Sequence, residues 1–495
     1  MNRFVLDWLA GDAKATRFLS RSAVAAATAL DHSETFLDAL IESNKRWGSN
    51  VADEVRRWAS GKTTAIVTGQ QVGIAGGPLY TIAKLASAIQ WKRQLAAKGQ
   101  DATVFFWLAS EDHDLAEAAT VHLPVSAIGT SHDINRQLDL VMLRPRILDS
   151  RSAVGPMPLP EDEVRRLVEL LNIPRPSWLR EGISFTDSFA ELHATAFAGE
   201  PIVFVDSLLP ELRRAASPFF EALMNRWAEA EGAITRRSTE LENAGYDAQV
   251  IPREGDAYTL LFRLDERMNR RMIEKPEAVG DAATLSTSAL TRPLLQDFVL
   301  RPDVFIGGPA EVAYYAQIAP LHHLLGIPTP RVALRGHVLV APRRLLKAAM
   351  RYGIDIGDAF NSADHLLTER EAPGVADIQA IAERAERSLS EEITRIGEIA
   401  LPAEHALARA INRSTGHIEY HFKKLTERAI RGLVRKDRER YAVAKELVSA
   451  LYPDRHVQDR IVNWFALWTR HGEAMLPAII DAVQPDDASF RIVGI

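Results

Sequence analysis

The apolar residues in the first quarter of the chain change from a short run to helical spacing and back to a run. Residues 65–67 form an apolar run, and a glycine-rich turn follows over 73–77. From Pro78 onward, apolar residues recur every three or four positions, which predicts a helix. A second apolar run, 103–108, ends in the polar cluster Glu111-Asp112-His113-Asp114. The pattern predicts a strand, a glycine turn, a helix, a strand and a polar cluster.

Later segments repeat this pattern. Residues 202–206 read as a buried strand that ends in an acid, and 338–340 as a further short strand. Residues 304–306 form another, followed by Gly307-Gly308-Pro309 at the start of a helical pattern. A strand, two glycines, a proline and a helix therefore occur twice. We expect an α/β fold, in which ligands bind at the carboxyl ends of the strands and helix N-termini favour anions.

The C-terminal part of the chain has a different character. Over 375–450, apolar residues step by three, four or seven positions, which is the near-heptad period of a coiled coil. We expect a sheet domain over 1–370 with insertions near 120–200 and 245–290, and an antiparallel helical coiled coil over 371–450, with its two helices joined at Leu401-Pro402. Residues 451–495 should return to the sheet domain. So narrow an arm exposes apolar surface unless it meets a partner, which predicts a homodimer.

Composition narrows the classes of function. The 495 residues carry a net charge of -6, so the whole molecule is not expected to bind nucleic acid or membrane surfaces. The chain has no cysteine, which excludes disulfides, thiolate metal sites and a cysteine nucleophile. No apolar run approaches the length of a membrane helix, about 20 residues. The N-terminal residues lack the apolar core of a signal peptide, so a cytoplasmic location is expected.

Common nucleotide and hydrolase motifs are absent. Gly61-Lys62-Thr63 resembles the end of a phosphate-binding loop, but Arg56 stands where the earlier glycine is needed. The tripeptide also precedes a strand instead of following one. No G-x-G-x-x-G motif follows a strand, and no G-x-S-x-G motif occurs.

The polar cluster at 111–114 is the strongest candidate for chemistry. Its three carboxylates around His113 suit a general base, a metal site or an amine-binding site, and equally a solvated loop with a helix N-cap acid. Its place at the end of a strand favours function. Gln70 and Gln71 suit hydrogen bonding to a ligand or to the loop backbone. Tyr80 and Lys84 share a helix face, from which Lys84 could reach a phosphate or serve as an ordinary surface lysine.

Several sequence blocks together resemble one family. They are TGQQVGIAGGPLYTIAK and FWLASEDHD in the first unit, VDSLLPELRRAASPFF, AGYDAQV, TRPLLQDFVL and FIGGPAEVAYYAQI in the middle, and LYPDRHVQDRIVNWF near the end. They span nearly the whole chain, and the chain resembles the family of cysteine ligases of bacillithiol biosynthesis, the bacillithiol cysteine-adding enzymes. The resemblance implies a Rossmann-like, nucleotidylyltransferase-type core with connecting insertions and a C-terminal coiled-coil arm that dimerises.

The resemblance also implies an activity. Members of the family add cysteine to the glucosamine-malate conjugate, in the last step of bacillithiol synthesis, with activation of the carboxylate by ATP and possible help from Mg²⁺. The chain lacks the His-x-Gly-His and Lys-Met-Ser-Lys-Ser motifs of the wider superfamily, and Arg301 intervenes between Leu300 and Pro302. Two alternatives stay open. One is a nucleotidylyltransferase-like enzyme acting on another amino acid or acid, and the other is a non-catalytic dimeric nucleotide-binding scaffold.

The residues expected at the site follow from the strand ends and the resemblance. In the ligase hypothesis, the backbone of the first glycine turn and Lys84 hold phosphate charge, the acids bind an ammonium group, and His113 acts as acid or base. The expected catalytic residues are Asp112, His113, Asp114 and Lys84. The expected substrate or nucleotide contacts are Gln70, Gln71, Gly76, Gly77, Pro78, Tyr80, Glu111, Gln296, Gly307, Gly308, Glu311 and Tyr315. No resident metal ligands are expected.

Overall fold

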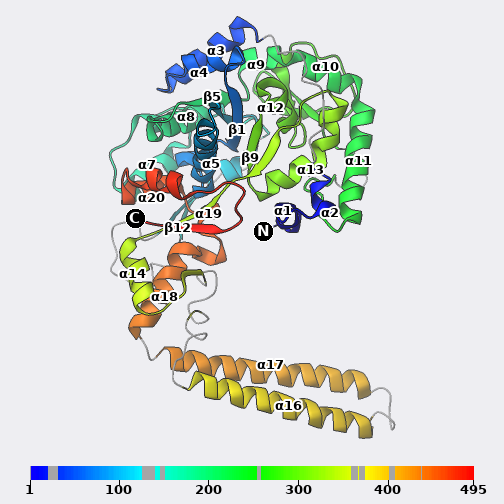
Figure 1. Cartoon of the computed structure of the whole chain (residues 1–495), viewed down its shortest axis with the longest axis vertical. Helices are drawn as coiled ribbons and strands as arrows, with labels where there is room; N and C mark the ends of the chain where they lie inside the picture. The colour runs from blue at the N-terminus through cyan, green and yellow to red at the C-terminus, as the bar shows by residue number, and fades with distance from the viewer. Residues whose placement is uncertain are drawn as a thin grey trace. The chain divides into compact units, whose positions relative to one another are not determined.

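The computed structural model describes residues 2–19, 32–124, 140–144, 151–252, 258–357, 366, 374–400, 407–435 and 438–495. The chain forms two compact units, whose elements are labelled in Figure 1. The first unit comprises Met1–His132, Leu140–Leu339 and Asp459–Val493, and the second comprises Asp133–Asp139, Val340–Gln458 and Gly494–Ile495. The boundary expected from the sequence, residue 370, lies within the second unit. Among the described residues, no helix combines the length and apolarity needed to cross a membrane.

A five-stranded parallel sheet forms the centre of the first unit. Its order is β10-β9-β1-β2-β5, and its strands are β1 (Thr64–Gln71), β2 (Ala102–Ala109), β5 (Ile202–Asp206), β9 (Val304–Gly307) and β10 (Arg331–Leu334). The chain moves from β1 outward to β2 and β5, and then returns to the other side of β1 for β9 and β10. The topological switch point, where ligands bind in such sheets, therefore lies between β1 and β9.

Both faces of this sheet are covered, which explains why its strands are nearly continuous apolar runs. Alternate residues such as Val67 and Phe105 belong to one core on one face. On the other face, Phe106 stacks on Phe189 and His193, with ring centroids 6.1 and 5.8 Å apart. The first core includes residues of α3 (Glu34–Arg46), α4 (Ala52–Ala59), α9 (Pro210–Ala215), α10 (Ser217–Asn225), α11 (Trp227–Asn243), α12 (Arg292–Leu300) and α13 (Pro309–Leu324). The second face carries α5 (Leu79–Ala96) and α8 (Phe185–Ala196). The predicted α/β fold is confirmed.

Smaller elements surround the sheet. The antiparallel pairs are β3 (Val121–Pro124) with β4 (Leu140–Leu143), and β6 (Leu261–Leu264) with β7 (Arg270–Met272) and β8 (Leu285–Thr287). The shorter helices of the first unit are α1 (Arg3–Leu9), α2 (Ala13–Thr16), α6 (Leu115–Ala118), α7 (Glu161–Leu171), α19 (Gln458–Ile461), α20 (Trp464–His471) and α21 (Met475–Ala482). Helix α21 packs on α5, so the end of the chain covers part of the sheet domain.

One strand of the central sheet was not predicted, and one predicted strand belongs to a different sheet. The pattern did not identify β10, because only four residues form it and its first, Arg331, is exposed. The expected strand at 338–340 does form, as β11 (His337–Ala341), but it pairs with β12 (Phe490–Gly494) in a separate two-stranded sheet. Residues adjacent in sequence therefore belong to different sheets, which the local apolar pattern does not reveal.

The second unit is helical. Helices α16 (Val375–Ala400) and α17 (Leu407–Val434) run side by side (Figure 1). The expected connection at Leu401-Pro402 lies outside the described residues. The unit also contains α14 (Arg343–Arg351) and α18 (Arg438–Leu451), which pack together. Several apolar side chains of the helix pair stay exposed, among them Ile381, Ile396, Ile399, Ile418 and Leu425.

Candidate functional site

The parallel register brings the predicted strand ends to one edge of the sheet. Gln71 aligns with Ala109 of β2, and Leu108 aligns with Asp206 of β5. On the other side of β1, Gly307 aligns with Leu334. The polar residues that follow these strands therefore gather at the carboxyl edge, as the sequence analysis expected.

A pocket of about 270 Å³ opens at this edge, beside the end of β1. Five of the expected site residues line it: Gln70, Gln71, Gly77, Pro78 and Tyr80. The other walls are residues that the sequence analysis did not select, notably Glu117 on α6, His122 on β3, and Arg460 and Asn463 from the C-terminal segment. The site therefore combines the glycine turn with a segment almost 400 residues away in the sequence.

Residues of the C-terminal segment donate hydrogen bonds to the backbone of the glycine turn. The Asn463 side chain donates to the carbonyl oxygens of Ala75 and Gly77, at 3.0 and 3.1 Å. The Trp464 indole donates to the Gly76 carbonyl at 3.0 Å. Gly76 has φ +79°, and a Cβ there would overlap the Trp464 ring. Only glycine therefore fits the close approach at 76.

The backbone donors of this turn are already used. The Gly76 N–H donates to Gly73, the Gly77 N–H to Ile74, and the Leu79 N–H to the Val462 carbonyl at 2.9 Å. The expected phosphate cradle of free N–H groups at 76–78 is therefore not available in this arrangement.

Lys84 lies at the switch point but is fully engaged. Its buried ammonium donates to the Gly69 carbonyl at 2.8 Å, to Gln70 Oε1 at 2.9 Å and to Glu311 Oε2 at 2.6 Å. Glu311 also accepts from the Gly308 N–H at 2.8 Å, which caps α13. Burial alone would raise the pKa of Glu311, but Lys84 and Arg292 hold it below its ordinary value. The pair joins α5 to α13 and leaves Lys84 no donor for a ligand.

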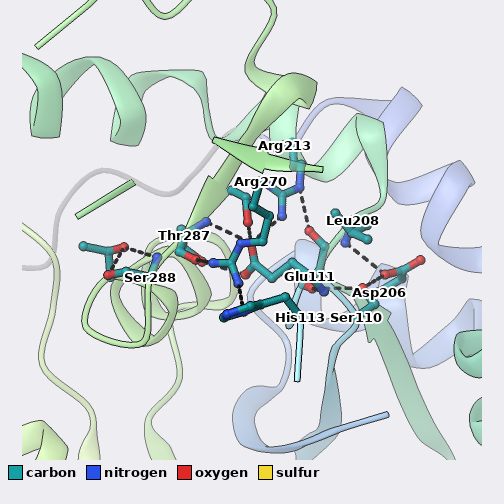
Figure 2. A network of polar contacts seen from close by, with 12 residues as sticks. Ser110, Glu111, His113, Asp206, Leu208, Arg213, Arg270, Thr287 and Ser288 are labelled. Carbon is teal, nitrogen blue, oxygen red and sulfur yellow. Dashed lines mark hydrogen bonds and ion pairs between the residues drawn. The ribbon is translucent and has the colours of Figure 1, made fainter. Parts of the chain in front are cut away.

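Glu111 is likewise directed into the protein (Figure 2). Its Oε2 accepts from Arg213 at 2.7 Å, from Ser286 at 2.8 Å and from the Thr287 N–H at 2.9 Å, while Thr287 Oγ1 donates to Oε1 at 2.6 Å. Both charged side chains are buried. Glu111 therefore connects the end of β2 to α9 and β8, and it has little capacity left to bind a substrate ammonium group.

The other members of the cluster are more open. Asp112 accepts from the backbone N–H groups of His113 and Asp114, at 2.6 and 3.2 Å. Asp114 caps α6 by accepting from the Glu117 N–H at 2.8 Å, which is the N-cap role considered from the sequence. Arg270 lies 2.9 Å from His113 Nδ1 (Figure 2), and Asp112 Oδ1 lies 3.5 Å from the same ring nitrogen.

Two expected contacts lie away from the pocket. Asp297 accepts from the Tyr315 hydroxyl at 3.1 Å and from Gln296 at 3.2 Å, and it pairs with His322 at 2.9 Å. All four side chains are buried between α12 and α13. In this structure, Gln296 and Tyr315 face a core network and not the pocket.

Glu117 is the carboxylate of the pocket that the sequence analysis overlooked. Burial raises its pKa, and the nearby charges of Asp114 and Asp112 raise it further. Burial also raises the pKa of Tyr80 to about 12, so its hydroxyl stays protonated at neutral pH. The only sequence signal for Glu117 was its place three residues after the acidic cluster.

The pKa of Glu117 predicts a dependence of stability on pH. A raised native pKa means that folding disfavours the ionised form, and this cost grows as pH rises from the ordinary glutamate pKa through the raised value. We expect Glu117→Gln to have the same free energy of unfolding as the parent near pH 4 and a higher one at pH 7.5, by at most about 0.5 kcal/mol. Urea denaturation at both pH values measures the difference, and Glu169→Gln, at an exposed position, is the control. A lower stability of Glu117→Gln than of the parent at pH 7.5 would contradict the prediction.

Fold and site together define a protein class: a Rossmann-like parallel sheet with a small pocket at its carboxyl edge, joined to a coiled-coil helix pair. Two family models match the chain, "Bacillithiol biosynthesis BshC, N-terminal Rossmann-like domain" over residues 10–336 and "Bacillithiol biosynthesis BshC, C-terminal coiled-coil domain" over 338–495. The chain belongs to this bacillithiol biosynthesis family, and the resemblance seen in the sequence is confirmed.

Relatives match along nearly the whole length. A protein of Solibacter usitatus named "Putative cysteine ligase BshC" is 30% identical over 95% of this chain and 91% of its own length. A protein of Koribacter versatilis with the same name is 30% identical over 84% of this chain and 81% of its own length. A third, from Salinibacter ruber, is 25% identical over 99% of this chain and 94% of its own length.

Proposed function

We propose that this protein is a ligase that joins cysteine to the glucosamine-malate conjugate, the last step in bacillithiol synthesis. The observation that carries the proposal is the pocket beside β1, at the carboxyl edge of the sheet, in a chain whose relatives are named cysteine ligases. Such an edge is where α/β enzymes bind their ligands. The pocket contains both a cationic and an anionic side chain, which suits substrates that carry carboxylates and amines.

Amide formation from the cysteine carboxylate needs a leaving group, and ATP supplies it when bound. An oxygen of the cysteine carboxylate bonds to phosphorus, and pyrophosphate or ADP departs. The amine nitrogen of glucosamine-malate then bonds to the acyl carbon of cysteine, the activated oxygen leaves with its phosphoryl group, and the amine proton passes to a base. Asp112 and His113 are both accessible to solvent, with their side chains 40% and 55% exposed, and we assign proton transfer to them.

We assign the phosphate charge to a side chain, because a backbone donor at each helix N-terminus of the switch point already has a protein partner. The Leu79 N–H is used by Val462, and the Gly308 N–H by Glu311. Arg292 is the cation whose charge acts on both Lys84 and Glu311. Its guanidinium has no hydrogen bond or ion pair within the described part of the chain, so we assign it to phosphate. No described group of three or more His, Asp and Glu is arranged to hold a metal, so Mg²⁺ would arrive with the phosphates.

Mass spectrometry of product tests the proposed function. Purified protein receives cysteine, glucosamine-malate, ATP and Mg²⁺, with each component omitted in turn. We expect bacillithiol only in the complete mixture, and AMP or ADP as the nucleotide product. His113→Ala and Asp112→Ala should each lower product formation about tenfold or more, whereas His323→Ala, an exposed histidine on α13, should not. Unchanged turnover in both site variants would exclude these roles, and release of pyrophosphate with another amino acid would favour the nucleotidylyltransferase-like alternative.

We also propose that the protein is a homodimer through the helix pair. Ile396 and Ile399 are 57% and 80% exposed on α16, and Leu425 is 63% exposed on α17. An exposed apolar stripe of near-heptad spacing is the surface that a second copy would cover. We expect Ile396→Glu with Ile399→Glu to convert a dimer to a monomer in light scattering, with unchanged helix content. A parent protein that is monomeric at micromolar concentration would contradict this.

A further inference from the structure

Arg460 lines the pocket with a positive charge, and its neighbours in the C-terminal segment fix its position. Its neighbour Asp459 is buried and pairs with Arg335 at 2.9 Å. Two residues further on, the Val462 carbonyl accepts from Leu79 at the first turn of α5. The backbone of Arg460 is therefore fixed on both sides, by Arg335 just after β10 and by the first residue of α5.

The Arg460 side chain itself has no partner among the residues that the structure describes. It lines the pocket, and within the described ranges its guanidinium makes no hydrogen bond or ion pair. An arginine held by a fixed backbone, with its donors open to a pocket, is suited to bidentate binding of a carboxylate.

Glu117 supplies the opposite charge in the same pocket. Its carboxylate has no hydrogen bond or ion pair with any described side chain, and it lies near the further negative charges of Asp112 and Asp114. No ion pair joins Glu117 to Arg460 in the described part of the structure. The pocket therefore presents one open cation and one open anion.

We propose that this pocket binds a substrate that carries both a carboxylate and an amine, with Arg460 holding the carboxylate and Glu117 the ammonium group. The inference rests on the proposed function, whose two organic substrates, cysteine and glucosamine-malate, both carry these groups. The volume of about 270 Å³ lies below the usual range for drug-sized ligands, which favours a small amino acid or acid over a whole nucleotide.

The test is binding to the full chain, measured by titration calorimetry without ATP. The ligands are cysteine, cysteamine, which lacks the carboxylate, N-acetylcysteine, which lacks the ammonium group, and glucosamine-malate. The variants are Arg460→Gln, Arg460→Lys and Glu117→Gln. Arg166→Gln and Glu169→Gln, both exposed on α7, are the matched controls. Thermal unfolding confirms that each variant is folded.

We expect the parent to bind cysteine about tenfold or more tightly than either truncated ligand, which is the range for one charge-assisted contact. Arg460→Gln should weaken cysteine binding about tenfold or more and leave cysteamine binding unchanged. Arg460→Lys should lose less affinity for cysteine than Arg460→Gln. Glu117→Gln should also weaken cysteine binding about tenfold or more, and it should leave N-acetylcysteine binding unchanged. If glucosamine-malate shows this dependence and cysteine does not, the pocket holds the acceptor, and the proposal stands with that substrate.

Other outcomes overturn the inference. It fails if neither substrate binds the parent, or if Arg460→Gln binds both substrates as the parent does, even when bacillithiol still forms. It also fails if Arg460→Gln weakens cysteine and cysteamine equally, because the loss then does not involve the carboxylate. Conversely, Arg460-dependent binding of a substrate with no product in the complete mixture would overturn the proposed function and support the pocket assignment.

Discussion

Replacing Glu111 by leucine is expected to lower the free energy of unfolding by about 3–5 kcal/mol, the usual cost of breaking a buried ion pair. The variant leaves the Arg213 guanidinium buried without its carboxylate, 2.7 Å away in the parent. It also removes the acceptor for Ser286 and Thr287. The loss should loosen the contact between the end of β2 and the β6–β8 sheet, whose polar contacts in the parent are shown in Figure 2.

A second variant tests the physical reason. Arg213→Met should lower the free energy of unfolding less than Glu111→Leu does, because Ser286 and Thr287 still donate to the Glu111 carboxylate. The double variant should lose less free energy of unfolding than the two single variants together, because no unpaired charge remains. Urea denaturation measures all three. Glu161→Gln is the control, since its pair with Arg175 is exposed and such pairs contribute about 0–1 kcal/mol. Equal losses in Glu111→Leu and Glu161→Gln would contradict the expectation.

The same pair predicts sensitivity to acid. Burial alone would raise the pKa of Glu111, but Arg213 and Arg270 hold it below its ordinary value. Its stabilising contribution is therefore complete above the ordinary glutamate pKa and is lost as pH falls through the lowered value. The stability difference between the parent and Glu111→Leu should shrink correspondingly below pH 4.

Replacing Trp464 by alanine is expected to lower the free energy of unfolding by about 3–5 kcal/mol, the range for a fully buried tryptophan. The side chain packs against the rings of His193 and Trp468, with centroids 5.3 and 5.8 Å away, and its indole donates to Gly76. The change removes the support of the glycine turn, so ligand binding in the pocket should weaken as well.

Graded variants separate packing from hydrogen bonding at this position. Trp464→Phe retains most of the packing and loses the bond to Gly76, so we expect a loss of about 1–2 kcal/mol. Gly76→Ala should disturb the same contact through the glycine turn, because its Cβ would overlap the Trp464 indole and its φ is positive. Denaturation and cysteine titration measure stability and binding together. The prediction is wrong if Trp464→Ala costs under about 1 kcal/mol.

Much of the fold follows from local patterns. The strands of the central sheet are buried on both faces, so β1, β2, β5 and β9 are apolar runs with clear ends. Because parallel strands end at one edge, the sequence also placed Gln70, Gln71 and Tyr80 near a ligand site, and all three line the pocket. These inferences need only a few neighbouring residues and the direction of the strands.

The orientation of polar side chains could not be predicted in the same way. Three acids follow β2, and only the positions of Arg213 and Thr287, more than 100 residues later, direct Glu111 inward. Gln296 and Tyr315 were expected to contact the ligand, yet in the core the Tyr315 hydroxyl and the Gln296 amide nitrogen both donate to Asp297. Arg460 had no local feature that marked it, because its neighbours in space come from the glycine turn.

The return of the chain to its first unit has a consequence for synthesis on the ribosome. The sheet strands are complete by residue 334, but the segment that supports Gly76 and supplies Arg460 is translated only after Val340–Gln458, the main part of the second unit. At about 5–20 residues per second, the nascent sheet domain waits on the order of ten seconds with the α5 surface that α21 covers still bare. A translation product that stops within the second unit would contain every strand of the central sheet and no finished pocket.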